Sequence, residues 1–553
     1  MDKQYKVIHY KSSEDVTSEL LQKGFIEDLS TTQNKHFKFF DEYFRYHKIQ
    51  TVVLEYEYID KDYLDDYSFY YSKCFINYPK KCCRAHFFKS SFSKVDFERE
   101  ILNNFGTEVI KAEETKCKSI LSNSNYVGFI VFRPIPLTLI GRTCLRPYCN
   151  DNGDYNREYL IVHNYKVNLF GKTLHVRSLA FQEQDRAVSA CATSALWSAF
   201  QSTGVIFHHS FPSPYEITKS ATKYFQLSDT SFPNKGLMLS QMAHAIRAVN
   251  LESLTVGFIN RSYMKAFIYA FIRGNIPVII GMNLIDHRKL TKPIEIDFHA
   301  VTSSGYALGL DEGSDIPFEI VGKQELFNSK KPPNLFLRSS RMKKIYVHDD
   351  QIGPYSRIIF DDPKSQDEVD YCYRSLATHW SDLEPKYEHV RAYPNALLIP
   401  IYNKIRIPYV SILQIVIELN FCVNYDLFTN NDSEAKKFIV WDIYLATVSD
   451  LKSNLRKENF SSPVEKLNFL TSDLPKYLWV VDGIFKNVKV FSFIFDATDI
   501  EHGKMFLLSI HYDSPNSLKF KSIFNILRNK PEVFDSVHRK VQIILESYSD
   551  IKI

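Results

Sequence analysis

The 553-residue sequence lacks the features of a membrane or nucleic-acid-binding protein. Its 68 Lys and Arg nearly balance 64 Asp and Glu, and a net charge of +4 does not supply the concentrated basic surface that nucleic acid requires. The most apolar stretches are interrupted: Gln414 and Glu418 lie within VSILQIVIELNF, and Arg273 and Asn275 within FIYAFIRGNIPVIIG. We therefore expect no nucleic-acid partner and no membrane insertion.

Cysteine is scarce and its pattern excludes two classes of site. The nine cysteines are an odd number at irregular spacing, and no Cys-x-x-Cys pair is present. A zinc ribbon and a dithiol redox motif are thereby excluded, and a reducing compartment fits best. The N-terminal stretch MDKQYKVIHYKSSEDV has no apolar leader. We expect a cytoplasmic protein without a metal or an organic cofactor.

The composition is that of a folded protein with several domains. Hydrophobic residues make up 45% of the chain and aromatic residues 14%, enough to fill the cores of about three domains. No internal repeat is evident, so changes of pattern set the boundaries. We expect a mixed region of unknown role at 1–125, a central domain with leading strands at 126–362, and an α+β region at 363–553 that is a possible substrate or partner module.

The central region contains the first candidate catalytic residue, Cys191. SACATSALWSAFQS has apolar residues at the spacing of a helix with one buried face, and Cys191 falls in its first turn. Unpaired amides and the helix dipole favour a thiolate there, which is the form a cysteine nucleophile needs. A small buried hydrophobic residue is the alternative interpretation. Helices followed by strands in this region predict an α+β fold.

Two later strands supply a candidate base and a candidate orienting group. His299 lies in the predicted strand DFHAVTSSGY, which would hold an imidazole rigidly enough for proton transfer. Asp349 ends the strand KKIYVHD and could accept the other imidazole N–H. Because side chains alternate along a strand, Asp349 and Asp350 are not expected to face the same partner, and we favour Asp349. A structural histidine and a turn-capping acidic pair are the alternatives.

Two glutamines are candidates for stabilising an oxyanion. Gln184 and Gln182 precede Cys191 by seven and nine residues. A side-chain amide at such a position can reach the oxygen on which negative charge develops during acyl transfer. A loop glutamine that faces solvent is the alternative for each.

The order of these residues resembles the papain-like cysteine peptidases, and among them the bacterial double-glycine leader peptidases and their stand-alone homologues. The likeness covers about residues 182–355, in QDRAVSACATSALWSAF, GLMLSQMAHAIRAV, IPVIIGMN, DFHAVTSSGYAL and IYVHDDQIGPY. It implies a core of helices packed on an antiparallel sheet. It also implies that Cys191 is the nucleophile, His299 the general base and acid, Asp349 the orienting residue and Gln184 the oxyanion donor.

The expected function is hydrolysis of a peptide or isopeptide bond in a peptide or protein substrate through a Cys-His-Asp triad. One alternative is another thiol-dependent acyl transfer, of the deamidase or transglutaminase type. The residues alone do not distinguish these reactions, because the same acyl-enzyme can react with water or with another nucleophile. The other is a binding or regulatory protein on a papain-like scaffold without catalysis. Ala192, where the family often has Gly, and the two large flanking regions favour it.

Overall fold

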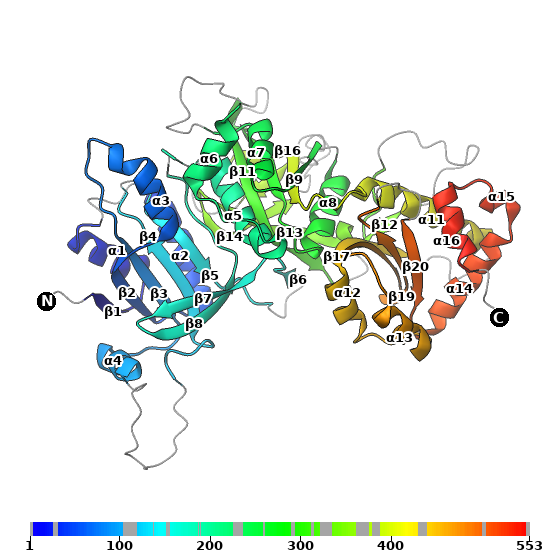
Figure 1. Cartoon of the computed structure of the whole chain (residues 1–553), viewed down its shortest axis with the longest axis horizontal. Helices are drawn as coiled ribbons and strands as arrows, with labels where there is room; N and C mark the ends of the chain where they lie inside the picture. Colours follow the sequence, from blue (N-terminus) through cyan, green and yellow to red (C-terminus); the bar gives the residue numbers. More distant parts are fainter. Residues whose placement is uncertain are drawn as a thin grey trace, which may run out of the picture.

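The computed structural model is mixed α+β with mostly antiparallel sheets, as the order of patterns predicted (Figure 1). Three sheet-containing regions follow one another along the longest axis, from the blue N-terminal region to the red C-terminal region. The structure describes residues 4–25, 31–102, 119–135, 138–150, 155–185, 187–188, 190–224, 236–257, 260–288, 294–310, 315–320, 334–360, 375–378, 388–429, 439–499 and 505–548.

The N-terminal region is a five-stranded antiparallel sheet with helices around it. Its strands are hydrogen-bonded in chain order from β1 to β5. The strands are β1 (Tyr5–His9), β2 (Thr51–Tyr58), β3 (Cys82–Phe88), β4 (Tyr126–Phe132) and β5 (Ile140–Leu145), and the helices are α1 (Ser13–Gln22), α2 (Thr31–His47), α3 (Lys61–Phe69), the 3-10 turn Tyr71–Lys73 and α4 (Lys94–Leu102).

The central region packs helices against an eight-stranded antiparallel sheet. β16 pairs with both β15 and β10, so β10, β11, β13, β14, β15 and β16 form a closed ring of pairings. The helices are α5 (Cys191–Phe207), α6 (Pro214–Thr222), α7 (Leu239–Ala248) and α8 (Arg261–Arg273). The strands are β6 (Tyr155–Glu158), β9 (Glu252–Gly257), β10 (Ile279–Asp286), β11 (Ile294–Gly309), β13 (Met342–Asp349), β14 (Gly353–Phe360), β15 (Leu376–Thr378) and β16 (Val390–Ile401), with the separate hairpin β7 (His163–Leu169) and β8 (Lys172–Ser178).

The C-terminal region has a five-stranded sheet in the order β12-β17-β18-β19-β20. Only the short pairing of β12 with β17 is parallel among its described pairings. The strands are β12 (Phe336–Leu337), β17 (Val440–Thr447), β18 (Tyr477–Phe485), β19 (Val488–Asp496) and β20 (Phe506–His511); the helices are the 3-10 turn Arg338–Arg341, α11 (Tyr409–Thr429), α12 (Val448–Leu455), α13 (Pro463–Thr471), α14 (Pro515–Arg528), α15 (Pro531–Phe534) and α16 (Arg539–Glu546). No described helix is long and apolar enough to cross a membrane.

Both boundaries taken from the sequence fall inside a sheet. The boundary at residue 125 separates β3 from β4, but these strands are hydrogen-bonded neighbours. The boundary at residue 362 separates β14 from β15 and β16, although β15 pairs with β14 and β16 closes the central ring. The corrected central region therefore contains β6 and the elements from α5 to β16, whereas the hairpin β7–β8 packs on β4 and β5 of the N-terminal sheet. The pattern did not reveal this because the pairings join segments far apart in the chain.

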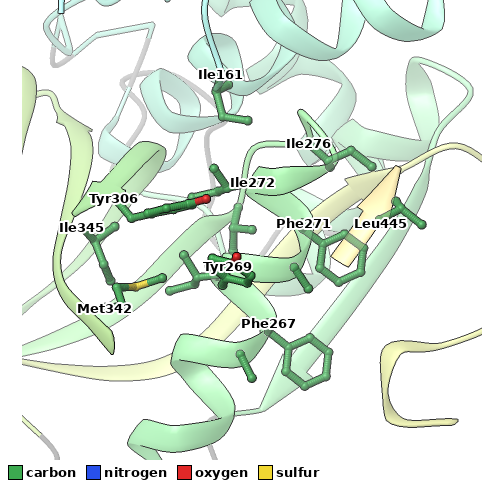
Figure 2. Packing of buried hydrophobic residues seen from close by; sticks show 14 of the residues in the cluster. Ile161, Phe267, Tyr269, Phe271, Ile272, Ile276, Tyr306, Met342, Ile345 and Leu445 are labelled. Carbon is green, nitrogen blue, oxygen red and sulfur yellow. The ribbon is translucent and has the colours of Figure 1, made fainter. Parts of the chain in front are cut away.

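One continuous core links the central and C-terminal regions through α8. Figure 2 shows side chains of this helix between Tyr306 and Met342 of the central sheet and Leu445 of β17. Tyr269 and Phe271 from α8 are each 1% exposed. Such a helix, buried on opposite faces, joins the two sheets by apolar contact. The C-terminal region is thus packed on the rest of the molecule rather than attached by a linker alone.

Candidate active site

Cys191 is the first residue of α5, as predicted. Its N-cap residue, Ala190, has extended backbone angles (φ −100°, ψ 178°) and no side-chain cap bond. The backbone N–H groups of the first turn therefore lack their usual acceptor, a polar side chain on the N-cap residue. Since the helix dipole adds partial positive charge there, the position favours an anion. The Cys191 side chain is half-buried, whereas Ala192 behind it is buried. A partly accessible thiol at such a helix end has the environment of a reactive cysteine.

Helix α5 is held against the strand that carries the candidate base. It packs on β10, β11 and β13. The Thr302 hydroxyl, three residues after His299, donates to the Ala195 carbonyl of α5 at 2.6 Å. Ala195 is buried and small, which allows the helix backbone to approach the sheet closely. The relative position of Cys191 and His299 is thus set by direct packing of rigid elements.

His299 lies on β11 between the thiol and a carboxylate. Its Nε2 is 3.0 Å from Oδ1 of Asp349. The Cys191 thiol is near enough to the imidazole to raise the pKa of His299. The thiol also lies 3.9 Å from the carbonyl oxygen of Phe298. Burial by itself lowers the pKa of His299, but the charge and hydrogen bond of Asp349, the nearby Cys191 thiol and the charge of Asp350 hold it well above its usual value. The arrangement favours an imidazolium beside the thiol.

Asp349 is fixed by the turn that follows β13. Its Oδ1 accepts the backbone N–H of Gln351 at 3.0 Å, and its backbone carbonyl accepts the N–H of Ile352 at 3.0 Å. The carboxylate is therefore held by its own turn while it accepts from His299. A carboxylate in this geometry fixes the orientation of the imidazole and the nitrogen that carries the proton.

Asp350 also faces His299, contrary to the expectation from strand alternation. Its Oδ1 lies 3.9 Å from Nε2 of His299. Alternation fails because β13 ends at Asp349, after a register shift that follows Val347, so that Asp350 belongs to the turn. Within the described residues the buried Asp350 carboxyl has no hydrogen-bond partner. Burial raises its pKa to about 7, an effect that His299 opposes and Asp349 reinforces.

His299, Asp349 and Asp350 are also close enough to hold one cation. One ligand atom from each lies within 4.8 Å of the other two, and all three residues are buried. Histidine with two carboxylates is a suitable donor set for several divalent metals. Because Nε2 of His299 is already hydrogen-bonded to Asp349, we assign the cluster to imidazole orientation instead.

Three predicted residues thus converge from a helix, a strand and a strand end. No protein-family model matches the chain, and a search of curated proteins gives no match. The chemistry is therefore argued from the geometry of the described residues. That geometry contains a candidate nucleophile, a base beside it and an orienting carboxylate.

Among the described residues, no hydrogen bond joins the fourth predicted residue, Gln184, to the other three. Gln184 is half-buried in the irregular segment before α5 and makes no hydrogen bond within the described residues. Gln182, the second candidate, is 3% exposed, and its amide nitrogen has no hydrogen-bond partner there. A buried amide donor without an acceptor is unusual in a folded protein. Both glutamines remain candidates for the oxyanion donor.

Sequence reasoning missed two titratable residues behind the site. His36 comes from α2 in the N-terminal region, and its Nε2 lies 3.2 Å from Glu183 in the segment that precedes Cys191. Both side chains are buried. The stretch HFKFFDEYF has only the pattern of an amphipathic helix, and nothing in it indicates that a histidine so distant in the chain approaches the site.

Proposed function

We propose that this protein is a cysteine peptidase with a papain-like core that hydrolyses a peptide or isopeptide bond. The observation that carries the proposal is the position of the buried His299 imidazole, between the half-buried Cys191 thiol and the Asp349 carboxylate 3.0 Å away. A thiol, a base and an orienting acid on rigid elements are the groups that nucleophilic acyl transfer requires. The described cysteines are free thiols, which fits work in a reducing compartment such as the cytoplasm.

The reaction follows from the roles of these groups. Cys191 gives its proton to His299, and its sulfur attacks the substrate carbonyl to form a tetrahedral intermediate. The backbone N–H of Cys191 and the amide of Gln184 or Gln182 bind the oxyanion. His299 then protonates the leaving amine, and the C–N bond breaks to leave a thioester. Water, deprotonated by His299, attacks the thioester and releases the acid product and the thiol.

Residue-specific alkylation tests the nucleophile and its base. Purified protein is treated with iodoacetamide between pH 5 and 9, and each cysteine is quantified by mass spectrometry. An ordinary thiol with a pKa of about 8.5 is almost entirely protonated at pH 5.5. We expect Cys191 to react at least about tenfold faster than the exposed Cys149 at that pH, and His299→Gln to abolish the difference.

Cys149 is the internal control because it is more exposed than Cys191. Accessibility alone would make Cys149 the faster of the two. Equal rates of the two thiols in wild-type protein would contradict the proposal. They would favour a binding protein on the same scaffold.

A second assay separates hydrolysis from other acyl transfers. A peptide library is incubated with wild-type protein and with Cys191→Ala, with and without a small primary amine, and the products are read by mass. Cleavage with gain of water, absent in the variant, supports the peptidase. Incorporation of the amine or loss of side-chain ammonia would instead identify a transglutaminase or a deamidase. Activity that survives in Cys191→Ala would exclude all three.

A further inference from the structure

The N-terminal helix α2 contacts both chain segments that build the candidate site. We infer that His36 of this helix is a positioning residue, which joins the segment before Cys191 to the turn that carries Asp349 and Asp350. The inference rests on the proposed function, since it assigns a role in that same site. The N-terminal region thereby contributes to catalysis by positioning the site, although it supplies none of the reacting groups.

The first contact of His36 is with the turn after β13. Its side chain is 1% exposed, and its Nδ1 lies 3.1 Å from the carbonyl oxygen of Ile352. A carbonyl oxygen only accepts, so Nδ1 carries the proton in this bond. The Ile352 N–H in turn donates to the Asp349 carbonyl. His36 therefore holds the short turn whose conformation presents both carboxylates to His299.

The second contact is with the segment that leads to the nucleophile. Nε2 of His36 lies 3.2 Å from Oε1 of Glu183, while Oε2 of Glu183 accepts the backbone N–H of Ile140 at 3.1 Å. The Arg133 guanidinium also donates to the Glu183 carbonyl at 3.1 Å. Glu183 stands between the two candidate oxyanion donors in the chain. Fixing it fixes the backbone that carries both.

A third contact places the same helix against the same turn. Phe39, three residues after His36 and hence on a neighbouring part of one helix face, packs on Gly353. A β-carbon at Gly353 would lie only 2.3 Å from the Phe39 ring, and the backbone there has φ +157°. Only glycine fits this close approach. The turn is thus held by a polar contact at Ile352 and an apolar contact at Gly353.

The charge of His36 also acts on the site. With Nδ1 donating to a carbonyl and Nε2 facing a carboxylate, the imidazolium is the form that satisfies both neighbours. The charged groups that face Asp350 are His299, Asp349 and His36. Burial raises the pKa of Asp350 to about 7, Asp349 reinforces this, and His299 and His36 oppose it. Loss of the His36 charge should move the titration of Asp350 to higher pH.

The test compares two buried histidines of one helix. His36→Ala removes both contacts, His36→Gln keeps a donor for Ile352 without the charge, and His47→Ala removes a 4% exposed histidine that packs on Tyr43 and Tyr148 instead. Cys191 alkylation by iodoacetamide is followed from pH 5 to 9. We expect His36→Ala to lower the rate at pH 5.5 about tenfold or more, and His47→Ala to leave it within twofold.

His36→Gln gives a readout that a purely structural role would not move. The charge of Asp350 acts on His299, so the titration of Asp350 near pH 7 should appear as a step in the rate profile. We expect His36→Gln to move this step to higher pH, because the group opposing the high pKa of Asp350 has lost its charge. This variant decides the matter if His36→Ala does not fold. An unshifted step, or equal losses in His36→Ala and His47→Ala, overturns the inference. A wild-type protein without His299-dependent reactivity would instead overturn the proposed function itself.

Discussion

The Asp350 carboxylate lies 3.9 Å from Nε2 of His299, although the residue before it already binds that atom. His299 therefore faces two buried carboxyl groups, of which only Asp349 has hydrogen-bond partners among the described residues. Two like charges at this spacing raise the pKa of the less well bound group. Asp350 is accordingly neutral in acid and charged above a pH of about 7.

Asp350 should make the stability of the protein depend on pH. Its pKa is raised to about 7 in the folded state, so between pH 4 and 7 the folded protein holds a proton that the unfolded chain releases. The protonated Asp350 carboxyl group therefore contributes its full stabilisation below about pH 4, and this stabilisation is lost as the pH rises through 7. At pH 8 we expect Asp350→Asn to have a higher urea midpoint than wild type and a free energy of unfolding that is larger by about 1 kcal/mol or more. At pH 5 the increase in the free energy of unfolding should be smaller. An equal effect at both pH values would show that the carboxyl group does not titrate in this range.

The two adjacent aspartates should differ in their effect on the thiol. Asp349→Asn removes the charge bonded to Nε2, so we expect Cys191 alkylation at pH 6 to fall at least about tenfold. Asp350 is largely neutral at that pH, and Asp350→Asn should change the rate less than about threefold. The pair is a matched control, since each variant replaces a buried carboxyl with an amide at neighbouring positions. The opposite ranking would make Asp350 the orienting residue.

The oxyanion donor can be assigned by a second matched pair. Gln182 has a buried amide nitrogen without a partner among the described residues, and Gln184 matches the family resemblance. Substitution by Ala of the residue that binds the oxyanion should lower kcat about 100-fold with little change in KM, because the bond forms only in the transition state. The other substitution should leave kcat within a fewfold. Two unaffected variants would mean that backbone amides alone bind the oxyanion.

The elements that hold Cys191 and His299 were predictable because local periodicity determines them. The apolar spacing after Cys191 gave α5, and the β-rich runs gave β11 and β13 at nearly their observed bounds. The side-chain direction of Asp350 was not predictable, since it depends on where β13 gives way to a turn. The role of His36 was beyond any local pattern, because Ile352 is 316 residues away in the chain.

The region boundaries failed for the same physical reason. Strand signals at Tyr126–Phe132 indicate a strand but not its neighbour, and pairing with β3 is a long-range choice. The place of the short strand Leu376–Thr378 likewise follows only from its pairings with β14 and β16, which complete the closed ring. Strand propensity reflects packing on neighbours rather than an intrinsic preference for one sheet.

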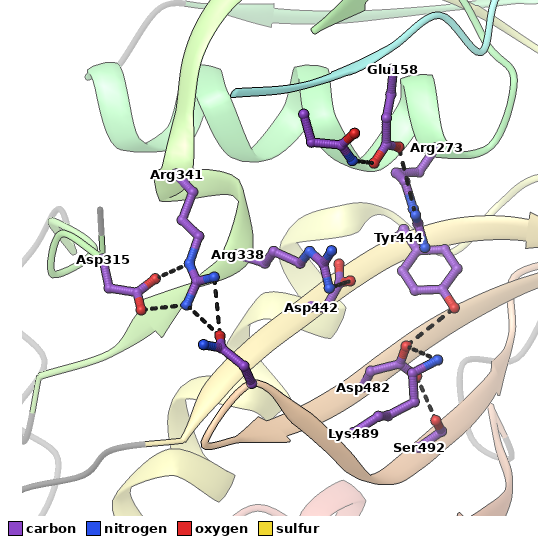
Figure 3. A network of polar contacts seen from close by, with 12 residues as sticks. Glu158, Arg273, Asp315, Arg338, Arg341, Asp442, Tyr444, Asp482, Lys489 and Ser492 are labelled. Carbon is purple, nitrogen blue, oxygen red and sulfur yellow. Dashed lines mark hydrogen bonds and ion pairs between the residues drawn. The ribbon is translucent and has the colours of Figure 1, made fainter. Parts of the chain in front are cut away.

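A buried charged network stands where the C-terminal sheet meets the central region (Figure 3). Asp442 and Asp482 are opposite each other on β17 and β18 and are 2% and 1% exposed. Arg338 lies 3.7 Å from Asp442, and Lys489 lies 2.9 Å from Asp482. Burial raises the pKa of Asp442, whereas Arg273 of α8 and Arg338 oppose that rise. The carboxylate thus balances Arg273 of the central region and Arg338 of the turn that follows β12.

Asp442→Ala should therefore destabilise the whole molecule rather than release a separate module. Removing one member of a buried ionic network leaves its partners uncompensated and costs about 3 kcal/mol or more. The exposed Asp473→Ala is the control and should change stability by less than about 0.5 kcal/mol. Urea-dependent labelling of Cys83 and Cys422, buried members of one continuous core in the N-terminal and C-terminal regions, reports both ends. Coincident midpoints that shift together are expected, because the core is unbroken between them. A shift confined to Cys422 would instead identify the C-terminal region as an independently unfolding unit.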